Sequence, residues 1–248
     1  MSSEPRFSRI RMFAGPNGSG KSRLKNEVKA KWLGVYLNAD DLERELASTS
    51  CIKLRSYQIK DLELFASLID YAGSSYPNLD MSLFKLDYKK GEVGINACAI
   101  NSYYAAVLIS AIREYLLRKK ISFSFETVMS HPSKIEFLAR AKEEGYRTYL
   151  YYVATEDPKI NINRVNIRVS EGGHNVPQDK IISRYKRSLE LLKDAVKVVD
   201  RSFIFDNSGD IDEQLELAET VREEGELRLY LKCHEVPQWF AESMGLGN

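Results

Sequence analysis

Short apolar runs alternate with longer amphipathic segments along most of this chain. Five of the runs are rich in β-branched and aromatic residues and are bounded by polar turn residues, which is typical of strands. Between them, apolar residues recur at spacings of three and four, which is typical of helices. The alternation predicts an α/β fold of three layers around a parallel five-stranded sheet. The expected strands lie at about residues 9–14, 34–37, 121–125, 147–153 and 201–206.

Residues 48–120 depart from this alternation. Apolar residues at helical spacing predict helices over Ile52–Tyr71 and Ile95–Lys119, with an irregular stretch between them that contains Pro77 and Gly91. We therefore expect a mostly helical insertion within one domain that spans residues 1–248.

The chain after the fifth strand gives a weaker pattern. Ile211–Glu224 is rich in charged helix-forming residues and predicts a helix or a partly irregular segment, and Leu227–Lys232 predicts an edge strand.

A glycine-rich loop follows the first strand directly. Its sequence, GPNGSGKS at residues 15–22, fits the pattern GxxxxGK[ST] of a phosphate-binding loop. Glycine allows positive φ angles, so that successive backbone N–H groups can point at phosphate oxygens. The helix expected from Lys21 to about Trp32 adds the positive end of its dipole.

The spacing assigns a role to each residue of this loop. The ammonium of Lys21 is expected to reach the β- and γ-phosphates of a nucleotide, and the hydroxyl of Ser22 to hold Mg²⁺. The other residues expected to contact the nucleotide are Gly15, Asn17, Gly18, Ser19 and Gly20.

Acidic residues follow two further strands. Asp40 and Asp41 come after the strand at 34–37, and Glu126 and Thr127 come after the strand at 121–125. Because the carboxyl ends of parallel strands share one edge of a sheet, these residues are expected beside the phosphate loop. A carboxylate there could accept a proton from a substrate hydroxyl or organise Mg²⁺, although a helix cap uses the same residue types. We favour a functional role for Asp40 and Glu126, and a cap for Asp41.

Two expected helices carry arginines. Ile160–Val169 has Arg164 and Arg168 four residues apart on one face, and a glycine pair separates it from a helix that bears Arg184. Arginines brought over a phosphate would neutralise the charge that develops in phosphoryl transfer. We therefore predict a mobile lid at about residues 159–192, with a solvated basic surface as the alternative.

Polar residues follow the last predicted strand of the parallel sheet. Asn207 could contact the nucleotide base, although a plain turn would use the same residue type.

Composition narrows the choice of partners. The 36 basic and 35 acidic residues leave a formal net charge of +1, so nucleic acid is an unlikely partner. The three cysteines are far apart and show no CxxC spacing, which argues against a disulfide framework or a zinc site. No run of about 18 apolar residues and no signal-peptide pattern occurs, so we expect a cytoplasmic protein without a membrane segment.

Five segments together resemble a known family. In order and spacing, FAGPNGSGKS, YLNADDLE, FSFETVMS, RVNIRVSEGGHNVPQDKIISRYKRSLELL and FIFDNSG are similar to the zeta-toxin family of small-molecule kinases, over roughly residues 8–210. The resemblance implies a nucleotide-kinase-like fold and a kinase that uses ATP or GTP and requires Mg²⁺. Characterised toxins of the family phosphorylate a sugar hydroxyl of UDP-N-acetylglucosamine, and the family name implies a cognate antitoxin as partner.

The resemblance also implies roles by position. Lys21 would bind the phosphates, Ser22 the metal, and Asp40 would activate the acceptor hydroxyl. The family's substrate-side Glu-Thr pair matches Glu126 and Thr127, and its arginines over the transferred phosphate match Arg164 and Arg168, with Arg184 as a weaker candidate.

Two other classes of function fit the same residues. The acceptor could be a nucleotide, an antibiotic or a polynucleotide end instead of a nucleotide sugar. Alternatively, the chain could be a nucleotide-binding switch or an ATPase that transfers phosphate only to water.

Overall fold

A computed structural model of the chain describes residues 7–96, 101–173, 175–209 and 214–246. The chain divides into two compact units, one formed by residues 1–33 with 125–248 and the other by residues 34–124. In the described part, no helix is both long enough and apolar enough to cross a membrane.

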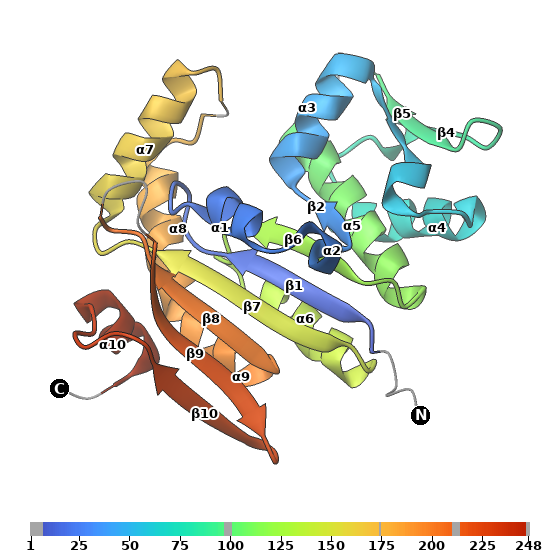
Figure 1. Cartoon of the computed structure of the whole chain (residues 1–248). Coiled ribbons are helices and arrows are strands. Elements are labelled where there is room, and N and C mark those ends of the chain that lie inside the picture. Colours follow the sequence, from blue (N-terminus) through green and yellow to red (C-terminus); the bar gives the residue numbers. More distant parts are fainter. Residues whose placement is uncertain (1–6, 97–100, 174, 210–213, 247–248) are drawn as a thin grey trace. The chain divides into compact units, whose positions relative to one another are not determined.

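A seven-stranded sheet forms the centre of the fold, in the order β10-β9-β8-β7-β1-β6-β2 (Figure 1). Strands β1, β7 and β8 are parallel, whereas β9 and β10 continue the sheet in antiparallel orientation. The predicted α/β fold and its five strands are therefore confirmed, but the predicted number of strands in the sheet is wrong. The strands are β1 (Arg9–Ala14), β2 (Val35–Leu37), β6 (Phe123–Thr127), β7 (Arg147–Ala154), β8 (Arg201–Asp206), β9 (Leu215–Glu223) and β10 (Glu226–Leu231).

The two additional strands correct the prediction for the end of the chain. The segment predicted as a helix or irregular, Ile211–Glu224, contains β9, and Leu227–Lys232 is β10 almost residue for residue. Positive φ angles at Glu224 and Gly225 close a tight two-residue hairpin between them. Pairing with β8 on one side and β10 on the other outweighs the helix propensity of the glutamates and leucines in β9.

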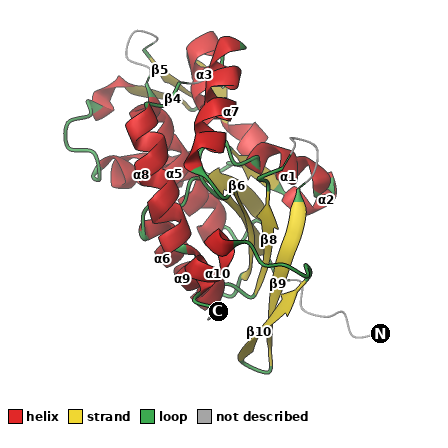
Figure 2. Ribbon diagram, turned by 90° about the vertical axis from the view of Figure 1, so that its left-hand side faces the viewer, coloured by secondary structure: helices red, strands yellow, loops and turns green. Residues whose placement is uncertain are grey.

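Helices cover the sheet of the first unit from both sides. Figure 2 shows α6, α9 and α10 on one side of the strands, and α1 with α2 on the other side. The single helix predicted from Lys21 to Trp32 is two helices, because Val28 is extended (ψ 129°). The helices of this unit are α1 (Lys21–Glu27), α2 (Ala30–Leu33), α6 (Ser133–Glu143), α7 (Pro158–Ser170), α8 (Gln178–Glu190), α9 (Leu192–Val198) and α10 (Gln238–Met244).

The second unit is helical with a small sheet of its own. Three short antiparallel strands in the order β3-β5-β4 occupy stretches that were predicted to be helical or irregular. The helix predicted over Ile52–Tyr71 begins only at Leu62, and the one predicted over Ile95–Lys119 is described from Ser102, because residues 97–100 lie outside the described part. The elements are α3 (Ala39–Thr49), β3 (Cys51–Lys53), the 3₁₀ turn η1 (Leu54–Tyr57), α4 (Leu62–Gly73), the 3₁₀ turn η2 (Met81–Leu83), β4 (Phe84–Asp87), β5 (Glu92–Ile95) and α5 (Ser102–Arg118).

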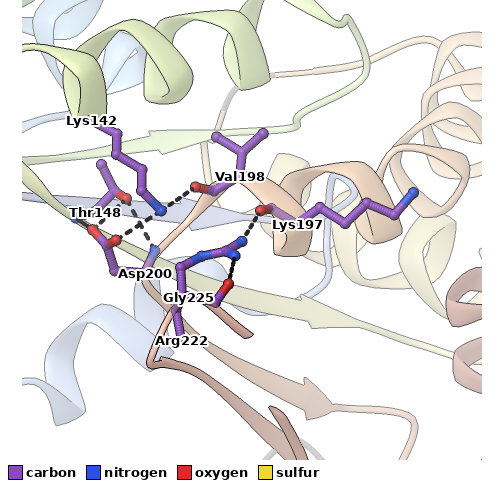
Figure 3. Close-up of polar contacts among 7 residues, drawn as sticks. All are labelled: Lys142, Thr148, Lys197, Val198, Asp200, Arg222 and Gly225. Carbon is purple, nitrogen blue, oxygen red and sulfur yellow. Dashed lines mark hydrogen bonds and ion pairs between the residues drawn. The ribbon is translucent and has the colours of Figure 1, made fainter. Parts of the chain in front are cut away.

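A polar cluster joins the amino-terminal ends of β7 and β8 (Figure 3). The carboxylate of Asp200 accepts hydrogen bonds from the backbone N–H (2.8 Å) and the hydroxyl (3.1 Å) of Thr148, and it pairs with the ammonium of Lys142 at 2.9 Å. Lys142 also donates to the carbonyl of Val198 at 3.1 Å. Nearby, Arg222 donates to the carbonyls of Gly225 and Lys197. The cluster thus ties α6, the end of α9 and three strands together.

We expect Asp200→Asn to lower the free energy of unfolding by about 1–3 kcal/mol, because it removes an acceptor of charge-assisted hydrogen bonds. Burial by itself would raise the pKa of Asp200, but the bonds from Lys142 and Thr148 outweigh it and hold the pKa below its usual range. The ionised form is therefore fully stabilising above the unfolded-state pKa of about 3.9, and this contribution disappears as pH falls through the folded-state value.

Urea unfolding at pH 7 and between pH 5 and 3 measures both effects. The control is Asp194→Asn, whose ion pair with Lys197 is exposed and is expected to contribute at most about 1 kcal/mol. Equal stability of the two variants at pH 7 would contradict this role of Asp200.

Candidate active site

The glycine-rich loop leaves β1 in a conformation that only glycine adopts readily. Gly15, Gly18 and Gly20 have φ angles of 143°, 75° and 97°. A Cβ atom on Gly15 would also lie 2.0 Å from the backbone oxygen of Val153 in the neighbouring strand β7. The loop therefore has the backbone geometry of an anion-binding turn, at the amino terminus of α1.

Lys21 folds back over the beginning of this loop. Its ammonium donates to the carbonyls of Gly15 at 2.9 Å and Pro16 at 2.8 Å. These bonds hold the positive charge against the loop, where phosphate oxygens would neutralise it.

Ser22 and Glu126 lie together. The hydroxyl of Ser22, in α1, donates to Oε2 of Glu126, at the end of β6, over 3.3 Å. The described residues contain no group of three or more His, Cys, Asp or Glu side chains that could hold a metal ion. Mg²⁺ is commonly held by one or two protein oxygens together with substrate phosphates, and this pair fits that donor set.

Thr127, the other predicted substrate residue on β6, stabilises a turn. Its hydroxyl accepts a hydrogen bond from the backbone N–H of Met129 at 3.1 Å. Met129 is fully buried with a φ of 53°, and the hydroxyl of Ser188 donates to the carbonyl of Val128 at 2.8 Å. The hydroxyl of Thr127 thus helps to hold the turn in which Met129 has a positive φ.

Asp40 belongs to the second unit and lies in the first turn of α3. Asn38 caps this helix by accepting from the N–H groups of Asp40 (2.9 Å) and Asp41 (3.4 Å). The cap predicted for Asp41 is therefore wrong, since its carboxylate pairs with Arg44 instead. Asp40 has an exposed side chain.

Arg164 contacts the loop that follows β8. Its guanidinium donates to the carbonyls of Asn207 at 2.8 Å and Gly209 at 2.9 Å. Burial lowers the pKa of Arg164, while the nearby carboxylate of Asp206 opposes that shift. In this structure the first turns of α7 are therefore fixed to the sheet edge.

Arg168 lies one turn further along α7, where the helix ends in a Schellman motif. The N–H groups of Gly172 and Gly173 donate to the carbonyls of Val169 (3.0 Å) and Arg168 (2.8 Å), and Gly172 has a φ of 86°. The glycine pair that separates the two arginine-bearing helices thus caps α7. Arg184 lies half-buried on α8.

A small apolar cluster joins α7 to α8. It consists of Val165, Val176 and Ile181, with Ile162 and Val169 packed against it.

Asn207 is only 4% exposed, and its amide points at the loop. Its Nδ2 donates to the carbonyl of Ser19 at 2.8 Å. Two further amide side chains, which the sequence did not mark as functional, also donate to carbonyls of the loop. Asn161 donates to the carbonyl of Asn17 at 2.6 Å, and Gln214 to that of Gly20 at 3.1 Å. No local pattern marks these contacts, which join residues 144 and 194 positions apart.

Comparison with known families identifies one stretch of the chain. The family model described as zeta toxin matches residues 98–216. This stretch is of zeta-toxin type. It contains Glu126, Thr127, Arg164 and Arg168 and ends after Asn207. The predicted resemblance is thereby confirmed.

Other proteins resemble the chain more distantly. An uncharacterised protein of Haemophilus influenzae is 32% identical over 71 residues, which cover 29% of this chain and 51% of that protein. A crystal structure of the AvrRxo1-ORF1:ORF2 complex is 13% identical, covers 96% of this chain and 64% of its own, and has a TM-score of 0.55. A second structure of that pair, with ATP, gives 14% identity, 90% and 60% coverage and a TM-score of 0.51.

These likenesses have a limited extent. The chain spans about half the length of the curated relative and less than two thirds of the chains in the two crystal structures. At such identities the two structures show a shared fold.

Proposed function

We propose that this chain is a Mg²⁺-dependent phosphotransferase of zeta-toxin type, which transfers the γ-phosphate of ATP or GTP to a hydroxyl of a small molecule. The observation that supports it best is the arrangement around the loop: Lys21 lies over the loop carbonyls, while Ser22 is hydrogen-bonded to Glu126. Phosphoryl transfer needs positioned positive charge and a metal more than it needs covalent chemistry from the protein.

The loop would bind the nucleotide. In this proposal the N–H groups of residues 15–22 surround the phosphates and Lys21 neutralises the β- and γ-phosphates. Ser22 and Glu126 would hold Mg²⁺, which supplies charge neutralisation when bound. Glu126 and Thr127 would also border the acceptor.

Asp40 is the proposed acceptor of the proton from the attacking hydroxyl. Its carboxylate is exposed. The proposal that it acts as the general base is based on its place in the sequence, just after β2. Arg164 and Arg168, with Arg184 as the weaker candidate, would neutralise the transferred phosphate. Residues 159–192 would form the lid within one kinase domain of residues 1–248.

The family resemblance makes UDP-N-acetylglucosamine the first acceptor to test. A nucleotide, an antibiotic or a polynucleotide end is the second choice, and a switch or ATPase without an acceptor is the third. The use of ATP is favoured by the similar structure determined with ATP. A protein partner that acts as an antitoxin is also proposed, and the two-protein complex among the similar structures favours it. We place the reaction in the cytoplasm.

Mg²⁺-dependent nucleotide affinity tests the metal pair. We expect Mg²⁺ to tighten binding of ATP or GTP to the wild type, and Ser22→Ala or Glu126→Gln to reduce that gain by about tenfold, because each removes one oxygen ligand or its partner. Calorimetric titrations with Mg²⁺ and with EDTA measure it.

The matched control is Glu143→Gln, at an exposed site on α6. An unchanged response to Mg²⁺ in both metal-pair variants would contradict these roles. Absence of nucleotide binding by the wild type would contradict the proposed function.

A further inference from the structure

Three amide side chains from distant parts of the chain converge on the phosphate loop. Asn161 of α7 donates to the carbonyl of Asn17, Asn207 after β8 to that of Ser19, and Gln214 before β9 to that of Gly20, at 2.6, 2.8 and 3.1 Å. All belong to the first unit. Each amide uses its NH₂ group, so all three fix carbonyl oxygens of the loop and leave its N–H groups to other partners.

Fixing a carbonyl also fixes an N–H group. The peptide unit is planar and trans, so the oxygen of one residue and the N–H of the next point in opposite directions. Bonds to the oxygens of residues 17, 19 and 20 therefore orient the N–H groups of Gly18, Gly20 and Lys21 away from the amides. Those are donors of the kind that a phosphate-binding loop directs at its ligand.

Two of the amides are themselves held in place. Asn161 is fully buried, and its Oδ1 accepts from the hydroxyl of the buried Thr155. The backbone of Asn207 donates to the carbonyl of Ala154 at 2.8 Å and accepts from Arg164 at 2.8 Å. A rigid support of this kind keeps the loop in one conformation before a ligand arrives.

The glycines of the loop leave room for this support. A Cβ on Gly18 would lie 2.6 Å from the backbone oxygen of Asn161. One on Gly20 would lie 2.4 Å from Nδ2 of Asn207 and 2.7 Å from Nε2 of Gln214. Gly18 occupies a position that the motif leaves free, so the close approach of α7 explains it better than the motif does.

We propose that Asn161, Asn207 and Gln214 are positioning residues that preset the N–H groups of the phosphate loop for a nucleoside triphosphate. The proposal rests on the proposed function, and it replaces the base contact predicted for Asn207, whose amide is engaged by the loop backbone. These three amides then act on the phosphate chain and make no contact with the base.

The test compares Asn161→Ala, Asn207→Ala and Gln214→Ala with the wild type in calorimetric titrations of ATP, GTP and adenosine. We expect each variant to weaken ATP and GTP by the same factor of about ten, with adenosine unchanged, because only the phosphate donors lose their alignment. The matched control is Ser202→Ala in β8, which removes a buried hydrogen bond to Thr220 without touching the loop. It should lower the unfolding temperature but leave ATP affinity unchanged.

Backbone order parameters measured by NMR on the nucleotide-free protein provide an independent measurement. The order parameters of Gly18, Gly20 and Lys21 are expected to fall from about 0.85 in the wild type and Ser202→Ala to below about 0.6 in the three variants, because the loop gains alternative conformations. Unchanged order parameters together with unchanged ATP affinity would overturn the positioning role. A change in the ATP-to-GTP ratio would restore the base contact. A wild type that binds no nucleotide would overturn the proposed function, while the order parameters still decide whether the amides hold the loop.

Discussion

Lys21→Ala is expected to weaken nucleotide binding by about tenfold to a hundredfold and to abolish phosphoryl transfer. The ammonium is held at 2.9 and 2.8 Å from the carbonyls of Gly15 and Pro16, so its charge is already placed against the phosphate loop. Charge-assisted hydrogen bonds of this type contribute roughly 1.5–3 kcal/mol each, and the stabilisation grows as charge develops in the transition state. Alanine removes both the charge and the donors.

Titration with ATP and Mg²⁺, followed by a transfer assay, measures the loss. The control is Lys29→Ala, which removes an exposed lysine just after α1 whose ammonium lies 5.3 Å from the centre of the Trp32 ring. That variant should match the wild type in both assays. If the Lys21→Ala protein keeps wild-type affinity or activity, the loop is not the nucleotide-binding site.

Asp40→Asn is expected to lower the rate of transfer by about 10²- to 10⁴-fold while nucleotide affinity changes little. An amide of the same shape cannot accept the proton of the attacking hydroxyl, and general-base catalysis contributes an effect of that size. The backbone cap that begins α3 uses the side chain of Asn38 and the N–H of Asp40, so the substitution leaves the helix intact.

Asp41→Asn is the matched control, because it neutralises the adjacent carboxylate, whose partner is the exposed Arg44. It should retain wild-type transfer within a factor of about three, since exposed ion pairs contribute little. If Asp40→Asn transfers phosphate as fast as Asp41→Asn, Asp40 is not the base. If both variants and the wild type hydrolyse ATP equally without an acceptor, the switch or ATPase is favoured.

Features set by local sequence could be predicted. The glycine pattern of residues 15–22 requires a strand before it and a helix after it, and β1 and α1 occupy those places. The five apolar runs are strands because each is flanked by polar turn residues. Ser22 and Glu126 could be expected to meet, since the carboxyl ends of parallel strands share an edge.

Features that depend on residues far away in the sequence could not be predicted. The three strands of the second unit have three or four residues each, too few for a period to emerge, and β9 is a strand because β8 and β10 flank it. The burial of β9 does not alternate, because Leu217 and Ala218 are both buried where its pairing with β8 is irregular. Gly225 after the strand is nevertheless a hairpin signal that could have corrected the helix prediction.

The amide support shows the same limit within the site. An asparagine in a helix or after a strand is common, and only the fold brings Asn161 and Asn207 to the loop. The fold also brings Trp239 of α10 to this region, where its indole N–H donates to the carboxylate of Asp206, next to Asn207, at 2.8 Å. The last described helix therefore helps to hold the strand end that supports the phosphate loop.

The most direct test of the central claim is a search for a phosphorylated product. The purified protein is incubated with Mg²⁺, γ-labelled ATP and a panel of nucleotide sugars, nucleosides and oligonucleotides, and each acceptor is weighed by mass spectrometry. We predict a phosphate-sized gain on one acceptor, first of all UDP-N-acetylglucosamine, that requires Mg²⁺ and disappears in Lys21→Ala and Asp40→Asn. Binding or hydrolysis of ATP with every acceptor unmodified would contradict the phosphotransferase and favour the switch or ATPase.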